Sequence, residues 1–206
     1  MLTPCPRCWS SKVEPTAEAG ARVYEPCRRC GGLGGVPLVN ASEHFTVAEC
    51  WGRQHRRPDG TSIPNDPPPD AVDRFARHLR ECIEPLRAKS GALRVTSGYR
   101  SQELDALAAG DNAWLHKFSG HSWGTATDLQ PMTAGLSLKD LMDMAIGDGA
   151  PLYDQAILEG GCLHLSAAAP RAGWLQRGMA MVRVRGPAGF KYEPYDGTPE
   201  QIARVA

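Results

Sequence analysis

The sequence predicts an α+β fold in which helices flank a small, mostly antiparallel sheet, preceded by a Cys-rich segment. Helical and strand-like patterns alternate from residue 70 to the C-terminus. The first 38 residues combine Cys, Gly and Pro with few large apolar side chains, so they need a cross-link such as a bound metal or a disulfide to fold. We divide the 206 residues into a Cys-rich unit at 1–38, a main domain at 39–170 and a C-terminal strand and helix extension at 171–206.

Two Cys-x-x-Cys pairs could provide this cross-link, namely Cys5 with Cys8 and Cys27 with Cys30, with 18 residues between the pairs. Thiolate pairs at that separation match a four-Cys zinc ribbon in which each pair lies on a tight knuckle. This segment alone is similar to the zinc knuckles of the DnaJ cysteine-rich region and to rubredoxin-like ribbons. The alternatives are a redox dithiol, a disulfide or free thiols.

Composition excludes several classes of protein. Lys plus Arg and Asp plus Glu both number 23, and this balance argues against a nucleic-acid coat or a polybasic membrane binder. Arg7, Arg28 and Arg29 give only weak support for nucleic-acid binding by the ribbon. No apolar run is long enough to span a bilayer, and the N-terminus lacks the pattern of a secretory signal. We therefore expect a protein made in a cytosol, with no membrane partner.

The longest predicted element is an amphipathic helix from Asp70 to Leu86. Asp70 is a favourable N-cap, and Pro85 predicts a kink or a last turn. The apolar residues recur at steps of three and four and form one continuous face, comprising Val72, Phe75, Ala76, Leu79, Cys82, Ile83 and Leu86.

The remaining elements are shorter. Residues rich in β-branched and apolar side chains, bounded by Gly and polar residues, predict strands at 93–97, 125–129, 155–158, 162–165 and 180–185. Further helices are expected at 102–109, at 138–146 with Ser137 as the cap, and from Pro199. Gly160 and Gly161 form the turn between two of the strands.

Three residues of the main domain form a candidate zinc site. His121 and Asp128 are seven residues apart, and His164 stands between two leucines. Singly, they suggest a loop histidine, a turn aspartate and a buried core histidine. Together they predict a zinc site with three protein ligands, which leaves one coordination position for water, as hydrolytic zinc requires.

A family resemblance strengthens this prediction. Ser97-Gly98-Tyr99-Arg100-Ser101, the Ser-x-His-x-x-Gly-x-Ala-x-Asp segment at 119–128 and the late His-x-Ser resemble the zinc D-Ala-D-Ala carboxypeptidase and phage endolysin peptidase family. The resemblance covers roughly residues 43–168. It implies a hedgehog-like fold, peptidoglycan stem peptides as substrates, and His121, Asp128 and His164 as the ligands of a catalytic zinc.

The resemblance also implies contacts with the substrate. Arg100 aligns with the arginine that meets a substrate carboxylate or carbonyl in related enzymes; the alternative is a surface salt bridge. Ser97, Tyr99 and Ser119 are expected in the same cleft, although Tyr99 could equally be a packing residue. His116 could contact the substrate, and the alternative is a plain loop histidine.

The general base is the point at which the sequence departs from part of the family. Several members place a Glu three residues before the last ligand, where this chain has Gly161. Another branch has Asp-Gln-x-Ile-x-Glu slightly earlier, and residues 154–159 fit that pattern. Glu159 is therefore the leading candidate for the proton carrier, with Asp154 as the second.

The sequence thus predicts a peptidoglycan peptidase with one catalytic and one structural Zn²⁺. The lack of a secretory signal beside a small zinc module suits a phage lysin or a tail-associated wall hydrolase, made in the host cytoplasm and acting at the cell wall. The ribbon would then contact the wall or other virion proteins. The alternative is a non-catalytic virion structural or adaptor protein that retains the peptidase fold.

Overall fold

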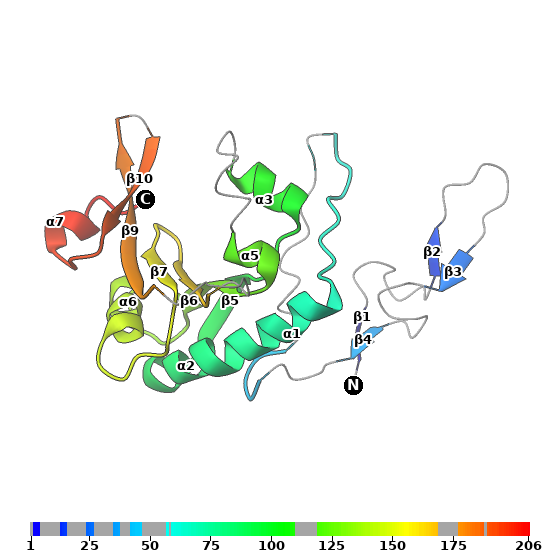
Figure 1. Cartoon of the computed structure of the whole chain (residues 1–206), viewed down its shortest axis with the longest axis horizontal. Coiled ribbons are helices and arrows are strands. Elements are labelled where there is room, and N and C mark those ends of the chain that lie inside the picture. Colours follow the sequence, from blue (N-terminus) through cyan, green and yellow to red (C-terminus); the bar gives the residue numbers. More distant parts are fainter. Residues whose placement is uncertain are drawn as a thin grey trace.

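The computed structural model describes the residues 2–4, 13–15, 24–26, 35–37, 42–46, 57, 59–109, 119–168, 177–187 and 189–206. Across these ranges the chain is α+β, which confirms the predicted class (Figure 1). His116 and the four cysteines of the predicted ribbon lie outside the described residues, and the ribbon stays a prediction. Four short strands are described in that region, pairing β1 (Leu2–Pro4) with β4 (Gly35–Pro37) and β2 (Val13–Pro15) with β3 (Tyr24–Pro26).

A six-stranded sheet in the order β10-β9-β7-β8-β6-β5 forms the centre of the fold. Its strands are β5 (Leu93–Ser97), β6 (Ala126–Pro131), β7 (Gln155–Leu158), β8 (Leu163–Ser166), β9 (Met179–Gly186) and β10 (Gly189–Pro194). Of these neighbouring pairs only β7 and β9 run parallel, so the sheet is mostly antiparallel, as predicted. The edge strand β10 is not predicted, because nearly all of its residues are exposed and no apolar alternation marks it.

Helices of different lengths accompany the sheet. One helical rod is built from α1 (Pro69–His78), the π-helical turn η2 (Leu79–Ile83) and α2 (Glu84–Ser90). The other helices among the described residues are α3 (Gln102–Ala109), α5 (Gly120–Trp123), α6 (Leu138–Ile146) and α7 (Pro199–Ile202). Figure 1 shows α1 and α2 on one side of the molecule, while α3 and the tip of the β9–β10 hairpin rise on the other. None of the helices described is long and apolar enough to cross a membrane.

The long helix differs from its prediction at both ends. Pro68, not Asp70, is the N-cap, and Pro69 takes the first helical position, where its missing N–H is no loss. Pro85 is not in the last turn, since α2 continues to Ser90. The wider π-turn ends two residues before this proline, which has no N–H to donate to the preceding turn.

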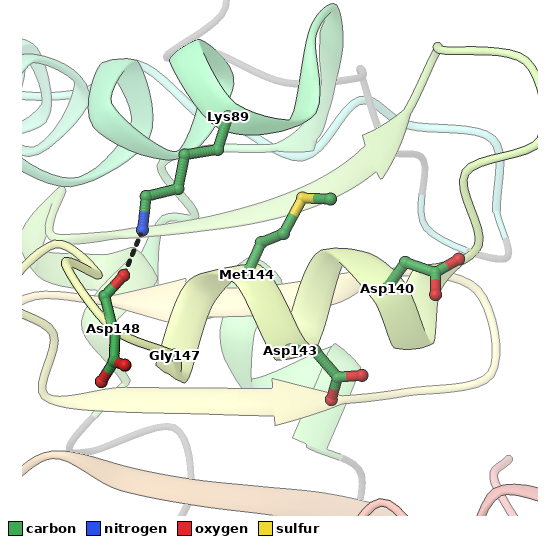
Figure 2. Close-up of a pocket in the computed structure, with 6 residues that line it drawn as sticks. All are labelled: Lys89, Asp140, Asp143, Met144, Gly147 and Asp148. Atoms are coloured by element: carbon green, nitrogen blue, oxygen red, sulfur yellow. Dashed lines mark hydrogen bonds between the residues drawn. The ribbon is translucent and has the colours of Figure 1, made fainter.

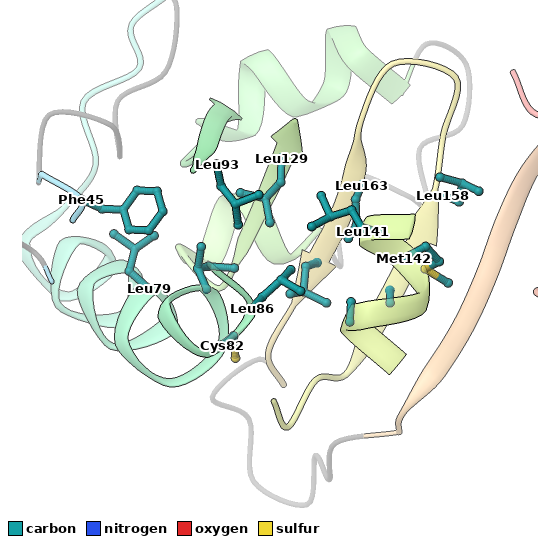
Figure 3. Packing of buried hydrophobic residues seen from close by; sticks show 14 of the residues in the cluster. Phe45, Leu79, Cys82, Leu86, Leu93, Leu129, Leu141, Met142, Leu158 and Leu163 are labelled. Carbon is teal, nitrogen blue, oxygen red and sulfur yellow. The ribbon is translucent and has the colours of Figure 1, made fainter. Parts of the chain in front are cut away.

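One face of the sheet and the helices α1, α2 and α6 enclose the apolar core (Figure 3). Leu129 and Leu163 from the sheet are fully buried there, together with Leu79 and Leu86 from the helical rod. Side chains alternate between the two faces of a strand, so the neighbours of these leucines in β6 and β8 point away from the core. The core therefore determines which residues reach the opposite face.

Candidate metal centre

Three side chains from three elements converge on the face of the sheet opposite the core. His121 comes from α5, Asp128 from β6 and His164 from β8. Asp128 and His164 oppose each other in the antiparallel register, which places their side chains side by side. His121 Nε2 lies 3.2 Å from both Asp128 Oδ1 and His164 Nδ1, and these two atoms are 3.0 Å apart.

These distances fit a tetrahedral zinc ion. Ligand atoms about 2.0–2.1 Å from zinc at tetrahedral angles are separated from one another by about 3.3 Å. Two imidazoles and one carboxylate are donors that zinc prefers, and three protein ligands are the number found in catalytic sites, whereas structural sites use four. The structure therefore brings the three predicted ligands together as a candidate metal centre.

The orientation of His121 is set by a second hydrogen bond. Its Nδ1 lies 2.6 Å from the carbonyl oxygen of Gly98, an acceptor, which assigns the ring proton to Nδ1 and leaves the lone pair of Nε2 for a metal. Histidines that bind metals commonly donate their other N–H in this way. The backbone of the predicted Ser97–Ser101 motif thus supports the metal centre directly.

The short helix α5 reaches this position because of the glycine that ends it. Gly124 has a φ of 71°, a left-handed conformation that favours glycine. A Cβ atom at Gly124 would lie 2.3 Å from the backbone oxygen of Ala71 in α1. The glycine therefore lets α5, and His121 with it, approach α1 closely.

A β-bulge brings Ser97 to the site. The register of β5 against β6 shifts between Val95 and Ser97, so that Val95 faces Leu129 on the core side and Ser97 faces Asp128. Without the shift, Thr96 would stand opposite Asp128. Bulges commonly re-aim a side chain beside a functional site.

Arg100 is engaged with the site itself. Its Nη2 donates to Asp128 Oδ2, and its Nε donates to Ser97 Oγ at 2.9 Å. Its Nη1 lies 3.7 Å from Oδ1 of Asp105, a buried residue of α3 that also accepts a hydrogen bond from Ser122 Oγ. Arg100 therefore positions the candidate ligand Asp128, and its contact with a substrate stays a prediction. Asp105 is not predicted from the sequence, because an acidic residue in the first turn of a helix is ordinary.

The histidines determine the charge of Asp128. Burial raises the pKa of this carboxyl, but the nearby His121 and His164 outweigh burial and hold its pKa well below the ordinary value. Asp128 is therefore a carboxylate at neutral pH, as a metal ligand must be.

Glu159, the leading candidate for the proton carrier, lies on the face of the sheet opposite the core, named the metal-bearing face after the candidate centre that it carries. It is two residues beyond Ile157, the β7 residue that opposes His164. Diagonal neighbours of this kind are about 7–8 Å apart between Cα atoms. Glu159 Oε2 forms an ion pair with Arg183 Nη1 at 3.0 Å. The turn at Gly160-Gly161 is closed by a hydrogen bond from the N–H of Glu159 to the carbonyl of Cys162.

Asp154, the second candidate, is held elsewhere. Its Oδ1 accepts hydrogen bonds from the backbone N–H and the Nε of Arg177, and its Oδ2 pairs with Arg177 Nη2 at 2.5 Å. The carboxylate is buried at the entrance to β7. It ties the chain that precedes β9 to the start of β7.

The other predicted substrate contacts have different surroundings. Tyr99 packs against the apolar core, and its carbonyl accepts a hydrogen bond from Asn65 Nδ2. Ser119 is the N-cap residue of α5 and is half-buried, two residues before His121.

A hollow of about 380 Å³ lies apart from the metal centre (Figure 2). Lys89 of α2 faces α6 across it and donates to the carbonyl of Asp148 at 2.9 Å. The other residues that line it belong to α6 and the turn that follows, namely Asp140, Asp143, Met144 and Gly147. No ligand of the candidate centre borders this hollow.

Comparisons of the chain with known protein families, with curated proteins and with solved structures give no match.

Proposed function

We propose that this protein is a zinc-dependent peptidase that cleaves the stem peptides of bacterial peptidoglycan. The convergence of His121 Nε2, Asp128 Oδ1 and His164 Nδ1 within 3.2 Å of one another carries the proposal. The resemblance of the motifs at 97–101 and 119–128 to the D-Ala-D-Ala carboxypeptidase and endolysin family supports the substrate class and the hedgehog-like fold. A phage lysin or a tail-associated wall hydrolase fits this activity.

Each residue around the centre has a separate task in this proposal. A zinc ion, when bound, supplies a Lewis acid that polarises the scissile carbonyl and makes water more acidic. Gly98 holds the His121 ring through its carbonyl, and Arg100 holds Asp128 through the carboxylate oxygen that faces away from the histidines. These two contacts keep the ligands in place before any substrate arrives.

Glu159 is the proposed proton carrier. Its carboxylate lies on the same face of the sheet as His164, and its ion pair with Arg183 limits its orientations. A carboxylate in this place can take a proton from water and deliver it to the leaving amine. Asp154 is not suited to this task, because Arg177 occupies both of its oxygens.

Release of new amino groups from purified peptidoglycan tests the proposal. We expect activity that a chelator removes and zinc restores. Glu159→Gln should lower the rate about 10²–10⁴-fold and keep its zinc, because only the proton carrier is lost. Glu193→Gln is the matched control: it removes a carboxylate from β10, whose residue 193 opposes the core residue Val182. It should leave the rate unchanged.

Removal of a ligand gives the opposite result. His164→Ala should lose one zinc per chain together with the activity. Equal amine release by the wild type and His164→Ala, or none by either, would contradict the proposal and favour a non-catalytic virion protein.

A further inference from the structure

The β9–β10 hairpin extends the metal-bearing face of the sheet beyond β7 (Figure 1). Ile157 of β7 opposes both His164 of β8 and Met181 of β9. Directly opposed residues of neighbouring strands point to the same face. Met181 therefore lies on the face of His164, and so does every second residue of β9 that follows it.

This rule places two arginines and two aromatic residues on the metal-bearing face. Arg183 and Arg185 follow Met181 at intervals of two along β9. In β10, Tyr192 opposes Arg183, and Phe190 opposes Arg185. The intervening residues of β9, Val182 and Val184, are fully buried on the core side, which agrees with this assignment.

Arg185 and Phe190 form an exposed cationic and aromatic surface. Phe190 is 57% exposed, and the guanidinium carbons of Arg183 and Arg185 lie 5.0 and 5.6 Å from the centre of its ring. Arg183 is neutralised by Glu159. In the described ranges no carboxylate forms an ion pair with Arg185. An uncompensated guanidinium beside an aromatic ring suits a carboxylate on a partly apolar chain.

Arg183 connects this surface with the surroundings of the candidate metal centre. Its guanidinium lies over the ring of Phe190 and also pairs with Glu159, which follows the β7 residue opposite His164 by two positions. Tyr192 opposes Arg183 on the same face. The surface around Arg185 and Phe190 therefore extends toward the candidate centre.

We propose that Arg185 and Phe190 form a subsite that binds a carboxylate of the peptide substrate, while the scissile bond lies at the metal centre. The proposal rests on the peptidase function proposed above. Arg100 is engaged with Asp128, Ser97 and Asp105, so a substrate anion needs another cation on this face. Among the arginines of the hairpin, Arg185 is the one whose guanidinium forms no such ion pair within the described residues.

The strand geometry predicts how far this carboxylate lies from the scissile bond. From β8 to β9 the sheet advances two strand spacings, about 10 Å, and from Met181 to Arg185 it advances four residues, about 13 Å. The diagonal from the metal centre is about 16 Å, which an extended peptide spans in about five residues. The reach of the arginine side chain shortens this, so we expect the carboxylate about three to five residues from the bond that is cut.

The subsite is tested with soluble, cross-linked stem peptides, prepared with free carboxylates and with the same carboxylates amidated. Arg185→Gln is compared with Lys191→Gln, since each removes one positive charge from the hairpin. Lys191 opposes Val184, so its side chain lies on the other face. Zinc content should be the same in both variants and in the wild type.

In Arg185→Gln we expect KM for the acidic peptide to rise about tenfold with kcat unchanged, as loss of one charge-assisted contact predicts. KM for the amidated peptide should not change, nor should Lys191→Gln alter either value. Phe190→Ala should show a smaller rise of the same kind.

An unchanged KM for the acidic peptide in Arg185→Gln would overturn the subsite and leave the peptidase function standing. If the wild type cleaves no peptide, the peptidase function fails, and calorimetric titration of the same acidic peptide decides the subsite separately. Binding about tenfold weaker in Arg185→Gln than in the wild type would support it. Equal binding, or none to the wild type, would overturn it.

Discussion

The two faces of the six-stranded sheet are made from the same strands but carry opposite chemistry. Leu129 and Leu163 are fully buried on the core face. Their immediate neighbours, Asp128 and His164, meet on the metal-bearing face. Because side chains alternate with a period of two, a slip of one residue in the register would exchange the two sets. The pairing register therefore determines the core and the candidate centre together.

The two faces also give histidine side chains different environments. His78 of α1 is buried on the core side, where its Nε2 lies 3.2 Å from Thr127 Oγ1. Burial, with help from the charges of His164 and His121, lowers the pKa of His78 to about 3. His164 lies on the opposite face of the sheet, beside the carboxylate of Asp128. An imidazole is thus a neutral packing group on one face and a candidate ligand on the other.

The largest effect should come from truncating each of two adjacent residues in β8 that point to opposite faces of the sheet. Leu163→Ala should lower the free energy of unfolding by about 2–5 kcal/mol, because it leaves a cavity in the core, while the zinc content of the folded protein stays the same. His164→Ala should remove one zinc per chain and change the stability of the zinc-free protein by about 1 kcal/mol or less. Denaturant unfolding with a chelator present and metal analysis measure the two effects. Equal destabilisation by both variants would show that the two faces are not separable.

A smaller effect is expected where α5 meets α1. Gly124→Ala introduces a Cβ atom 2.3 Å from the Ala71 carbonyl oxygen at a φ of 71°, so α5 must move or strain. We expect a loss of about 1–3 kcal/mol in unfolding free energy and weaker zinc binding, because His121 moves with the helix. Gly135→Ala is the control: Gly135 has a φ of 82°, but a Cβ there meets no other atom within 4 Å. It should lose stability and keep its zinc affinity, whereas equal zinc affinity in both variants would contradict this account.

Per pH unit, the smallest effect is the pH dependence that His78 adds to stability. The folded pKa is about 3, below the ordinary value of 6.5, so between these values the unfolded chain holds a proton that the folded chain lacks. Stability from this residue is complete above the upper value and falls as the pH drops through the window, by up to about 1.4 kcal/mol per pH unit. In zinc-free protein, His78→Gln should flatten the plot of unfolding free energy against pH between 6.5 and 4. Parallel plots for the two proteins would contradict the prediction.

Elements with strong local signals are predictable from the chain. The helix α6 begins where the pattern predicts and contains the predicted apolar residues through Ile146, and its predicted cap, Ser137, accepts a hydrogen bond from the N–H of Asp140 in a capping box. The strands β5 and β7 also match their predicted bounds. In contrast, β10 and the π-turn before Pro85 are missed. An exposed edge strand carries no apolar alternation, and a π-turn depends on how a whole helix packs.

The same distinction between local sequence signals and tertiary contacts applies to the candidate site. Its ligand types are visible in the chain because affinity for zinc belongs to the side chains of His121, Asp128 and His164. Only the tertiary structure shows that Arg100 is held by Asp128, and that Glu159 is paired with Arg183. These pairs join residues well separated in sequence, and the strand register and a β-bulge bring them together. No local pattern encodes such contacts, because they depend on which strands become neighbours when the core is buried.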